Sequence, residues 1–179
     1  MYKGMPQHYD ILPEVLTANR IRNFAEIGVY KGKFTKLMLR RIGCYLDNYW
    51  AIDQWSPLTD GDTGWMADIP TTQWDEYYRR ACKLMTYFPN LRVIRQPSVE
   101  AATLFPDGYF DMVYIDASHF YEEVLKDIKA WKPKVRPGGI LGGHDYVQKR
   151  ANMQAKKAVD EMFPEGVTTL EDAVWMVKL

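Results

Sequence analysis

The sequence is poor in cysteine and carries no net charge, and each scarcity excludes a class of protein. Its two cysteines, Cys44 and Cys82, have a spacing that fits neither a metal site nor a redox motif. Lysine plus arginine and aspartate plus glutamate number 23 each. This balance argues against a surface dedicated to nucleic acid or to an anionic membrane. We therefore expect no nucleic-acid and no membrane partner, and free thiols indicate a reducing cytoplasm.

Long apolar runs are also missing. No run approaches the roughly 18 residues that a membrane span requires, and the first eight residues carry no apolar signal core. These absences lead us to expect a cytoplasmic protein. We expect residues 1–179 to form a single domain, large enough to bury a core without disulfides.

What the sequence does contain is an alternation of helix and strand patterns. Apolar spacing near 3.6 residues predicts helices, and short runs rich in β-branched and aromatic residues predict strands. This alternation implies an α/β fold with a parallel sheet covered by helices on both faces. The last two strands are expected to pair antiparallel. Predicted helices cover residues 10–18, 33–42, 72–88, 99–104, 121–131 and 155–163, and predicted strands cover 23–27, 49–52, 91–94, 110–115, 139–143, 167–170 and 174–177.

Residues 55–71 interrupt this alternation and show no clear period. The stretch is rich in proline and glycine and follows the end of a predicted strand, where a lid over a ligand would lie. Trp55, Trp65 and Met66 are then candidates to cover that ligand. The alternative is a surface loop packed by its own aromatic side chains.

The N-terminal residues 1–19 are expected to form a helical cover segment. Its aromatic side chains, Tyr2 and Tyr9, suit the covering of a pocket, either in the same chain or in a neighbour within a homo-oligomer. His8 lies in this segment, and we assign to it no role beyond covering a substrate.

A glycine-containing loop, Glu26–Gly32, joins a predicted strand to a predicted helix. Its glycines permit unusual dihedrals and close approach of a ligand, and the following helix offers free N–H groups to an anion. The fingerprint G-x-G-x-x-G is absent because Tyr30 occupies the position of its second glycine. Simple turn chemistry is the alternative. Asp53 ends the next strand, where an acid typically accepts two ribose hydroxyls, or else it only caps the strand.

Two acid–histidine clusters close successive strand patterns. Asp116 and His119 follow the strand at 110–115, and His144 and Asp145 follow the next one. Ligands of an open parallel sheet bind outside the carboxyl ends of its strands, so one shared site with a metal ion is predicted. A divalent cation favours ionisation of a hydroxyl, and a neutral imidazole removes the proton. The alternative is structural, with strand-end and turn roles for the clusters and Ser118 capping the next helix.

Together these motifs resemble the class I S-adenosylmethionine-dependent methyltransferases over about residues 20–178. Glu26, Gly28 and Gly32 match the acidic-x-Gly-x-Gly-x-Gly motif of that family, and Pro137-Gly138-Gly139 matches the motif before its fifth strand. The resemblance implies a three-layer Rossmann-like fold with a mostly parallel seven-stranded sheet ending in an antiparallel hairpin. It places Glu26 and Gly28 at the methionine end of the cofactor, Asp53 at the ribose and Ser98 at the adenine. The implied cofactor residues are Glu26, Gly28, Tyr30, Gly32, Asp53, Ser98 and Asp116.

The acid–histidine clusters look like those of the metal-dependent O-methyltransferases, especially the branch with macrolide-sugar enzymes. That resemblance implies a divalent metal on Asp116 and Asp145, with His119 as general base where catechol-type enzymes have lysine. His144 departs from the usual acidic residue and either ligates the metal or assists. Oxygen ligands point to Mg²⁺, while a ligating imidazole leaves Mn²⁺ or Fe²⁺ open.

The sequence thus predicts an S-adenosylmethionine-dependent, metal-assisted O-methyltransferase acting on a hydroxyl of a small molecule. Two alternatives stay open. One is a metal-dependent enzyme on the same scaffold that resembles the cephalosporin-modifying hydroxylase type. The other is a non-catalytic S-adenosylmethionine-binding protein. No motif identifies the acceptor.

Overall fold

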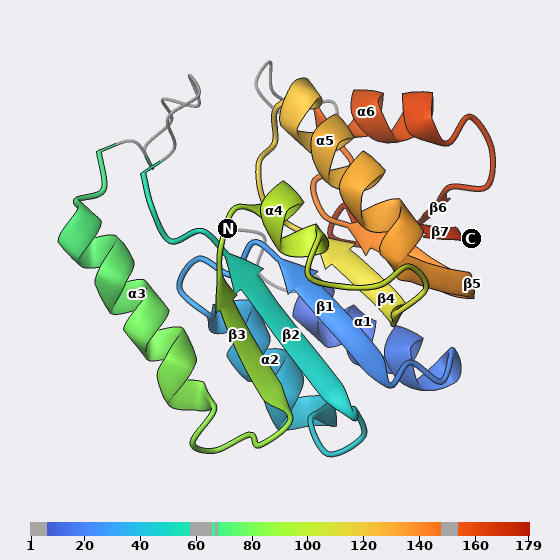
Figure 1. Cartoon of the computed structure of the whole chain (residues 1–179). Coiled ribbons are helices and arrows are strands. Elements are labelled where there is room, and N and C mark those ends of the chain that lie inside the picture. The colour runs from blue at the N-terminus through green and yellow to red at the C-terminus, as the bar shows by residue number, and fades with distance from the viewer. Residues whose placement is uncertain (1–6, 58–65, 67, 148–153) are drawn as a thin grey trace.

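A computed structural model describes residues 7–57, 66, 68–147 and 154–179 (Figure 1). Its strands form one sheet, and helices lie on both faces of that sheet. The strands are β1 (Asn23–Ile27), β2 (Asn48–Asp53), β3 (Leu91–Arg95), β4 (Phe110–Ile115), β5 (Val135–Gly143), β6 (Thr168–Thr169) and β7 (Trp175–Lys178). The helices are α1 (His8–Ala18), α2 (Lys33–Ile42), α3 (Thr71–Leu84), α4 (Ser98–Ala102), α5 (Tyr121–Trp131), the 3-10 turn η1 (Lys132–Lys134) and α6 (Ala155–Met162).

The strand order is β3-β2-β1-β4-β5-β7-β6. Strands β1 to β5 are parallel, whereas β7 runs antiparallel to both β5 and β6. This confirms the predicted seven-stranded, mostly parallel sheet with a C-terminal antiparallel hairpin. From β1 the chain winds first toward β3 and then, after crossing to β4, toward the opposite edge. The winding therefore reverses between β1 and β4, which is where open α/β sheets bind their ligands.

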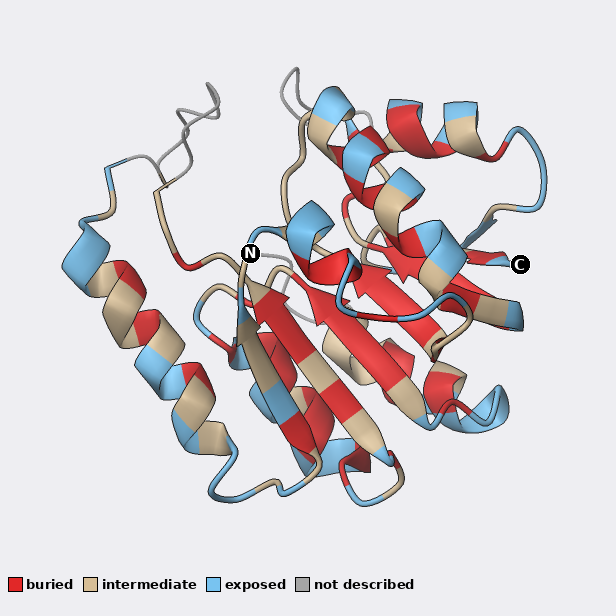
Figure 2. Cartoon of the chain, viewed as in Figure 1, coloured by how far each residue is buried: buried red, intermediate tan, exposed pale blue. Residues whose placement is uncertain are grey.

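Side chains of the central strands point alternately to the two faces of the sheet, and each face has its own hydrophobic core. Phe24, Met112 and Tyr114 pack with α1, α2 and α3, while the neighbouring Ala25 and Val113 pack with α4, α5 and α6. Figure 2 shows the central strands buried along most of their length. Helices cover both faces of a parallel sheet, so its strands are nearly continuous apolar runs. The central strands of this sequence follow that pattern.

Several element boundaries differ from the sequence prediction, most of them by one or two residues, and three of the differences have a consequence or an identifiable cause. Strand β5 begins at Val135 because Val135 pairs with Phe110, and a register shift then accommodates the exposed Pro137 and Gly138 as a bulge inside the strand. Helix α3 ends at Leu84, four residues early, where the chain tightens into a turn over residues 85–87, and Pro89 disfavours helical geometry at the residue that follows the turn. Helix α1 begins at His8, two residues before the predicted start, so this histidine belongs to the first turn of the helix.

None of the helices in the described ranges is long and apolar enough to cross a membrane. The predicted lid at 55–71 lies largely outside the described residues, as do Trp65 and residues 1–6 of the N-terminal segment. Met66 is described and packs at the margin of the core on the α1–α3 face.

Candidate functional site

The parallel hydrogen-bond ladder continues past three strand ends and aligns the predicted site residues. The N–H of Gly28 donates to Ile52 O at 2.9 Å, and the N–H of Asp116 donates to Ile27 O at 2.7 Å. The N–H of His144 donates to Ile115 O at 3.0 Å. Gly28, Asp116 and His144 are therefore fixed side by side at the carboxyl edge of β1, β4 and β5. The sequence prediction that these strand ends meet is confirmed in geometry.

Gly28 permits this alignment through its backbone. Its φ is +92°, and a Cβ on it would overlap the backbone carbonyl of Asp116. Glycine is therefore required at this position because the backbone that follows β1 passes close to the backbone that follows β4. Gly32 has φ +71°, and a Cβ on it would make only an ordinary contact with Leu84, at 3.9 Å, so only its conformation favours glycine.

Asp53 holds the loop after β1 in place. Its Oδ2 accepts the N–H groups of Val29 and Tyr30 at 2.9 and 2.8 Å, and its Oδ1 accepts that of Trp55 at 2.7 Å. Burial raises the pKa of Asp53, while these backbone hydrogen bonds oppose the rise. A carboxylate has about four acceptor positions, so Asp53 keeps capacity for a further donor such as a ribose hydroxyl.

Trp55 is a correction to the prediction of a covering side chain. It is fully buried, its ring packs on Tyr78, and its Nε1–H donates to Tyr30 O at 2.8 Å. Tyr30 itself has φ +51°, a left-handed conformation unusual for a tyrosine. Trp55 therefore secures the strained loop from inside and does not cover a ligand.

Glu26 lies beneath the loop, 1% exposed. Its Oε2 accepts the hydroxyls of Thr35 and Tyr49 at 2.6 and 2.7 Å. Burial raises the pKa of Glu26 to about 8, against these two hydrogen bonds, which lower it. Its carboxyl group thus ties β1 to α2 and β2 and is mostly protonated at neutral pH.

Ser98 begins α4, and its hydroxyl is engaged inside the protein. Its Oγ accepts the Nε1–H of Trp131 at 2.9 Å and also forms a hydrogen bond with Asp127. Burial raises the pKa of Asp127 to about 7. These contacts join α4 to α5. They engage the hydroxyl of Ser98, the residue that the family resemblance places at the adenine.

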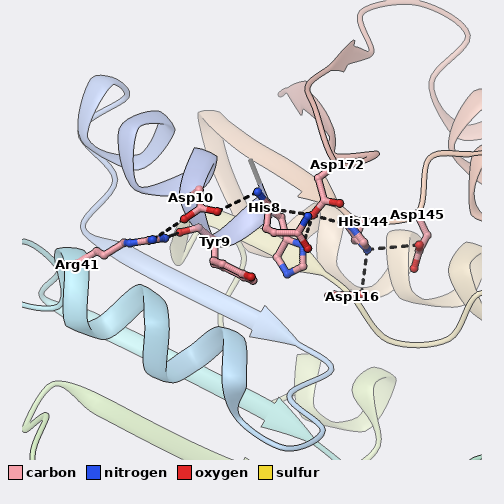
Figure 3. Close-up of polar contacts among 9 residues, drawn as sticks. His8, Tyr9, Asp10, Arg41, Asp116, His144, Asp145 and Asp172 are labelled. Atoms are coloured by element: carbon pink, nitrogen blue, oxygen red, sulfur yellow. Dashed lines mark hydrogen bonds and ion pairs between the residues drawn. The ribbon is translucent and has the colours of Figure 1, made fainter. Parts of the chain in front are cut away.

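The two acid–histidine clusters meet around His144. Its Nδ1 lies 3.4 Å from Asp145 Oδ1 and 3.8 Å from Asp116 Oδ1 (Figure 3). One ligand atom from each of these three residues lies within 4.8 Å of the others, so the group can hold a metal ion. Asp145 has φ +59°. Such strained residues cluster at functional sites.

Asp145 also connects His144 to His119. Its Oδ2 lies 3.0 Å from His119 Nδ1. Burial works to raise the pKa of Asp145, but the hydrogen bonds from His119 and His144 hold that pKa well below its usual range. Burial would lower the pKa of His144, yet the hydrogen bond to Asp145 and the surrounding carboxylates raise it to about 9. Asp116, His119 and His144 line a small cavity of about 10 Å³, which is about the room that one water needs.

Two residues of this region were not predicted from the sequence. His8, at the start of α1, places its Nδ1 2.8 Å from Asp172 Oδ2, and its backbone N–H donates to the same oxygen at 2.7 Å. Asp172 lies in the turn between β6 and β7 with φ +55°, and its Oδ2 is 3.5 Å from His144 Nε2. Only the tertiary fold joins these three, because they come from opposite ends of the chain. The scarcity of histidine was the one signal in the sequence.

Comparison with known sequences identifies the domain. A family model described as a methyltransferase domain matches residues 25–146, more than half of the chain. The chain is also similar to the uncharacterized protein y4gI of Sinorhizobium fredii, with 26% identity over 130 residues. That match covers 72% of this chain but 13% of the relative, so the chain spans only a small part of that protein's length.

Comparison with solved structures supports the same fold. The O-methyltransferase NovP superposes with a TM-score of 0.66 at 18% identity, over 93% of this chain and 75% of NovP. An O-methyltransferase from Bacillus cereus in complex with SAH gives 0.64 at 12% identity, over 100% and 84%. A SAM-dependent methyltransferase from Aquifex aeolicus gives 0.57 at 14%, over 92% and 87%. At these identities the likeness concerns the fold alone.

Proposed function

Because the chain belongs to the methyltransferase domain family, we propose that it transfers a methyl group from S-adenosylmethionine to a hydroxyl of a small molecule, assisted by a divalent cation. One observation carries the proposal. Asp145 contacts both His119 and His144 beside Asp116, and Asp116 follows β4, next to the point where the winding of the sheet reverses. A base and a candidate cation site thus share one carboxylate.

For the cofactor, the proposal uses the loop after β1 together with Asp53. The loop lies at the carboxyl edge, beside the cation site, and Asp53 retains acceptor positions for the ribose. The bound S-adenosylmethionine supplies an electrophilic methyl group. Glu26 supports this loop from below through Thr35 and Tyr49 and need not touch the cofactor.

The donor set of Asp116, Asp145 and His144 fits a divalent cation. Carboxylate oxygens suit Mg²⁺, and the nearby imidazole also suits Mn²⁺. When bound, such a cation supplies positive charge that favours ionisation of the acceptor hydroxyl. His119 then accepts the hydroxyl proton, and ionised Asp145 stabilises the resulting imidazolium. The oxygen bonds to the methyl carbon as the carbon–sulfur bond breaks, leaving S-adenosylhomocysteine.

The cavity beside His119 indicates where the acceptor hydroxyl would lie, and it sets no limit on the size of the acceptor. Its volume of about 10 Å³ accommodates a hydroxyl-sized group. The remainder of the acceptor must therefore lie outside this cavity, above the carboxyl edge.

Calorimetric titration with S-adenosylhomocysteine (SAH) tests the proposal. We expect wild-type protein to bind SAH and Asp53→Asn to bind it about 10-fold or more weakly, because a hydrogen bond to a charged acceptor contributes roughly 1.5–3 kcal/mol. Asp47→Asn is the matched control, since Asp47 is exposed at the opposite edge of the sheet and pairs with Arg22. A thermal melt of each variant separates lost binding from lost folding. Absence of SAH binding by the folded wild type would refute the proposal.

A further inference from the structure

The contact between α1 and the end of the sheet has the composition of a cation site of its own. His8, His144 and Asp172 each offer one ligand atom, and these atoms lie within 4.8 Å of one another. We propose that His8, His144 and Asp172 bind a divalent transition-metal ion of the Zn²⁺ or Mn²⁺ class, at a position distinct from the Asp116–Asp145 site. Figure 3 shows the three side chains converging.

The spacing of these atoms suits a metal ion. Ligands at about 2.1 Å from a metal are separated from one another by roughly 3–3.4 Å in octahedral or tetrahedral geometry. The distance between His144 Nε2 and Asp172 Oδ2 is 3.5 Å, and that between His8 Nδ1 and Asp172 Oδ2 is 2.8 Å. The two imidazole centroids are 4.5 Å apart. Only small side-chain shifts are needed to place all three around one ion.

A second observation points to a ligand at this position. The Nε2 atom of His144 is buried and has no hydrogen-bond partner among the residues that the structure describes. Buried polar atoms are nearly always hydrogen-bonded, so an unpaired one indicates room for a water, a ligand or an ion, and beside a second imidazole and a carboxylate an ion fits best. The neighbouring Asp172 oxygen, at 3.5 Å, is beyond a good hydrogen-bond length. This nitrogen is therefore directed at Asp172 and His8 without being satisfied by them.

The two nitrogens of His144 face two chemically different sites, and because a neutral imidazole has one lone pair, His144 ligates only one ion at a time. When Nε2 binds the ion, the Nδ1–H remains a donor to the carboxylates of the first site. Nδ1 faces the carboxylates of Asp116 and Asp145, whereas Nε2 faces Asp172 and His8. The first group is dominated by oxygen, which suits Mg²⁺. The second has two imidazoles and one carboxylate, a set that favours transition metals over Mg²⁺. An ion there would join the first turn of α1 to β5 and to the β6–β7 turn.

Nuclear magnetic resonance of histidine-labelled, untagged protein tests this directly, because the chain has three histidines. We expect about one equivalent of Zn²⁺ to shift the imidazole nitrogens of His8 and His144, with a smaller effect on His119. The inference is overturned if the His8 resonances do not move, or if His119 moves in place of His8. No cofactor or acceptor is required, so the outcome is independent of the proposed methyl transfer.

Zn²⁺ affinity in variants locates the ion. We expect His8→Gln to weaken Zn²⁺ binding at least 10-fold and Asp116→Asn to change it less than threefold. His8→Gln keeps the backbone N–H that Asp172 caps, so it is a cleaner variant than Asp172→Asn, which should weaken binding similarly. Thermal melts without metal verify that each variant is folded. Equal affinity in wild type and folded His8→Gln, or loss only in Asp116→Asn, would contradict the site.

Discussion

The carboxyl edge of the sheet has two halves that differ in how their charges are satisfied. In the β1–β2 half, defined by Glu26, the loop after β1 and Asp53, the carboxylates accept hydrogen bonds from the chain itself. In the β4–β5 half, defined by Asp116, His119, His144 and Asp145, carboxylates and imidazoles face one another, and a buried nitrogen lacks a partner among the described residues.

We infer from this difference that the carboxyl groups of the β1–β2 half stabilise the loop, whereas the groups of the β4–β5 half are placed to bind a ligand. A carboxylate that accepts three backbone N–H groups is largely explained by the fold, as at Asp53, which keeps one acceptor position for a ligand. A cluster of three carboxylates and three imidazoles, counting Asp172 and His8, is not explained by internal hydrogen bonding alone. The predictions below alter one half at a time, beginning with the largest expected effect.

Asp116→Asn should have the largest effect, because it removes a proposed cation ligand from the β4–β5 half. We expect methyl transfer to an acceptor of the wild-type protein to fall about 1,000-fold, since metal polarisation contributes several kcal/mol. SAH affinity should change much less. Asp107→Asn is the control, because Asp107 is exposed and pairs with Lys134. Full turnover in Asp116→Asn would refute the metal part of the proposal.

His119→Gln should lower kcat by about 100- to 1,000-fold, the usual contribution of a general base. The KM for S-adenosylmethionine should stay nearly constant, because His119 belongs to the β4–β5 half. Added imidazole should restore part of the rate in the variant and not in Asp116→Asn. A purely structural role for His119 would instead lower thermal stability and give no rescue.

Gly28→Ala should test the contact between the halves. We expect a loss of about 3 kcal/mol or more in the free energy of unfolding, because the added Cβ would overlap the Asp116 backbone and φ is positive. Gly166→Ala is matched in φ, at +83°, but has nothing within 4 Å of its Cβ position. It should lose about 1 kcal/mol. Urea denaturation measures both, and equal losses would contradict the close approach.

Near pH 5, where Glu26 is protonated in the fold, Glu26→Gln should have the smallest effect of these variants, and its consequence is seen as a pH dependence. The folded pKa of Glu26, about 8, lies above its ordinary value, so its stabilising contribution is complete below pH 4.5 and is lost as pH rises toward 8. Wild-type unfolding free energy should therefore fall by a few kcal/mol more than that of Glu26→Gln between pH 5 and 8. Parallel pH profiles for the two proteins would show that Glu26 is ionised in the fold.

Local sequence pattern predicts much of this fold, because periodicity and breakers act within one element. The predicted bounds of β1, α2, β4 and α5 agree with the structure for this reason. Pro137-Gly138 reads as the end of a turn, yet the pairing of Val135 with Phe110 extends β5 across it. That pairing is a long-range contact and cannot be read from a local pattern.

The residues of the candidate site were likewise only partly predictable from local sequence patterns. Asp116, His119, His144 and Asp145 follow strand ends, and the topology of a parallel sheet gathers strand ends at one edge. His8 and Asp172 belong to no strand end, and only the packing of α1 and the terminal hairpin brings them to His144. Trp55 was predicted as a cover because it begins a stretch without a clear period at the carboxyl end of a strand, while its burial depends on α3 packing over it.

The central claim is that the two halves form one site, with cofactor in one and cation in the other. Relaxation of the methyl carbon of bound S-adenosyl-[methyl-13C]methionine by Mn²⁺ tests it without an acceptor. We predict strong paramagnetic broadening of the bound methyl signal in wild type and in His8→Gln, which lacks the second proposed cation site, and little broadening when Asp116→Asn is added to His8→Gln. A methyl signal that stays sharp when both ligands are bound to the wild-type protein would contradict the account.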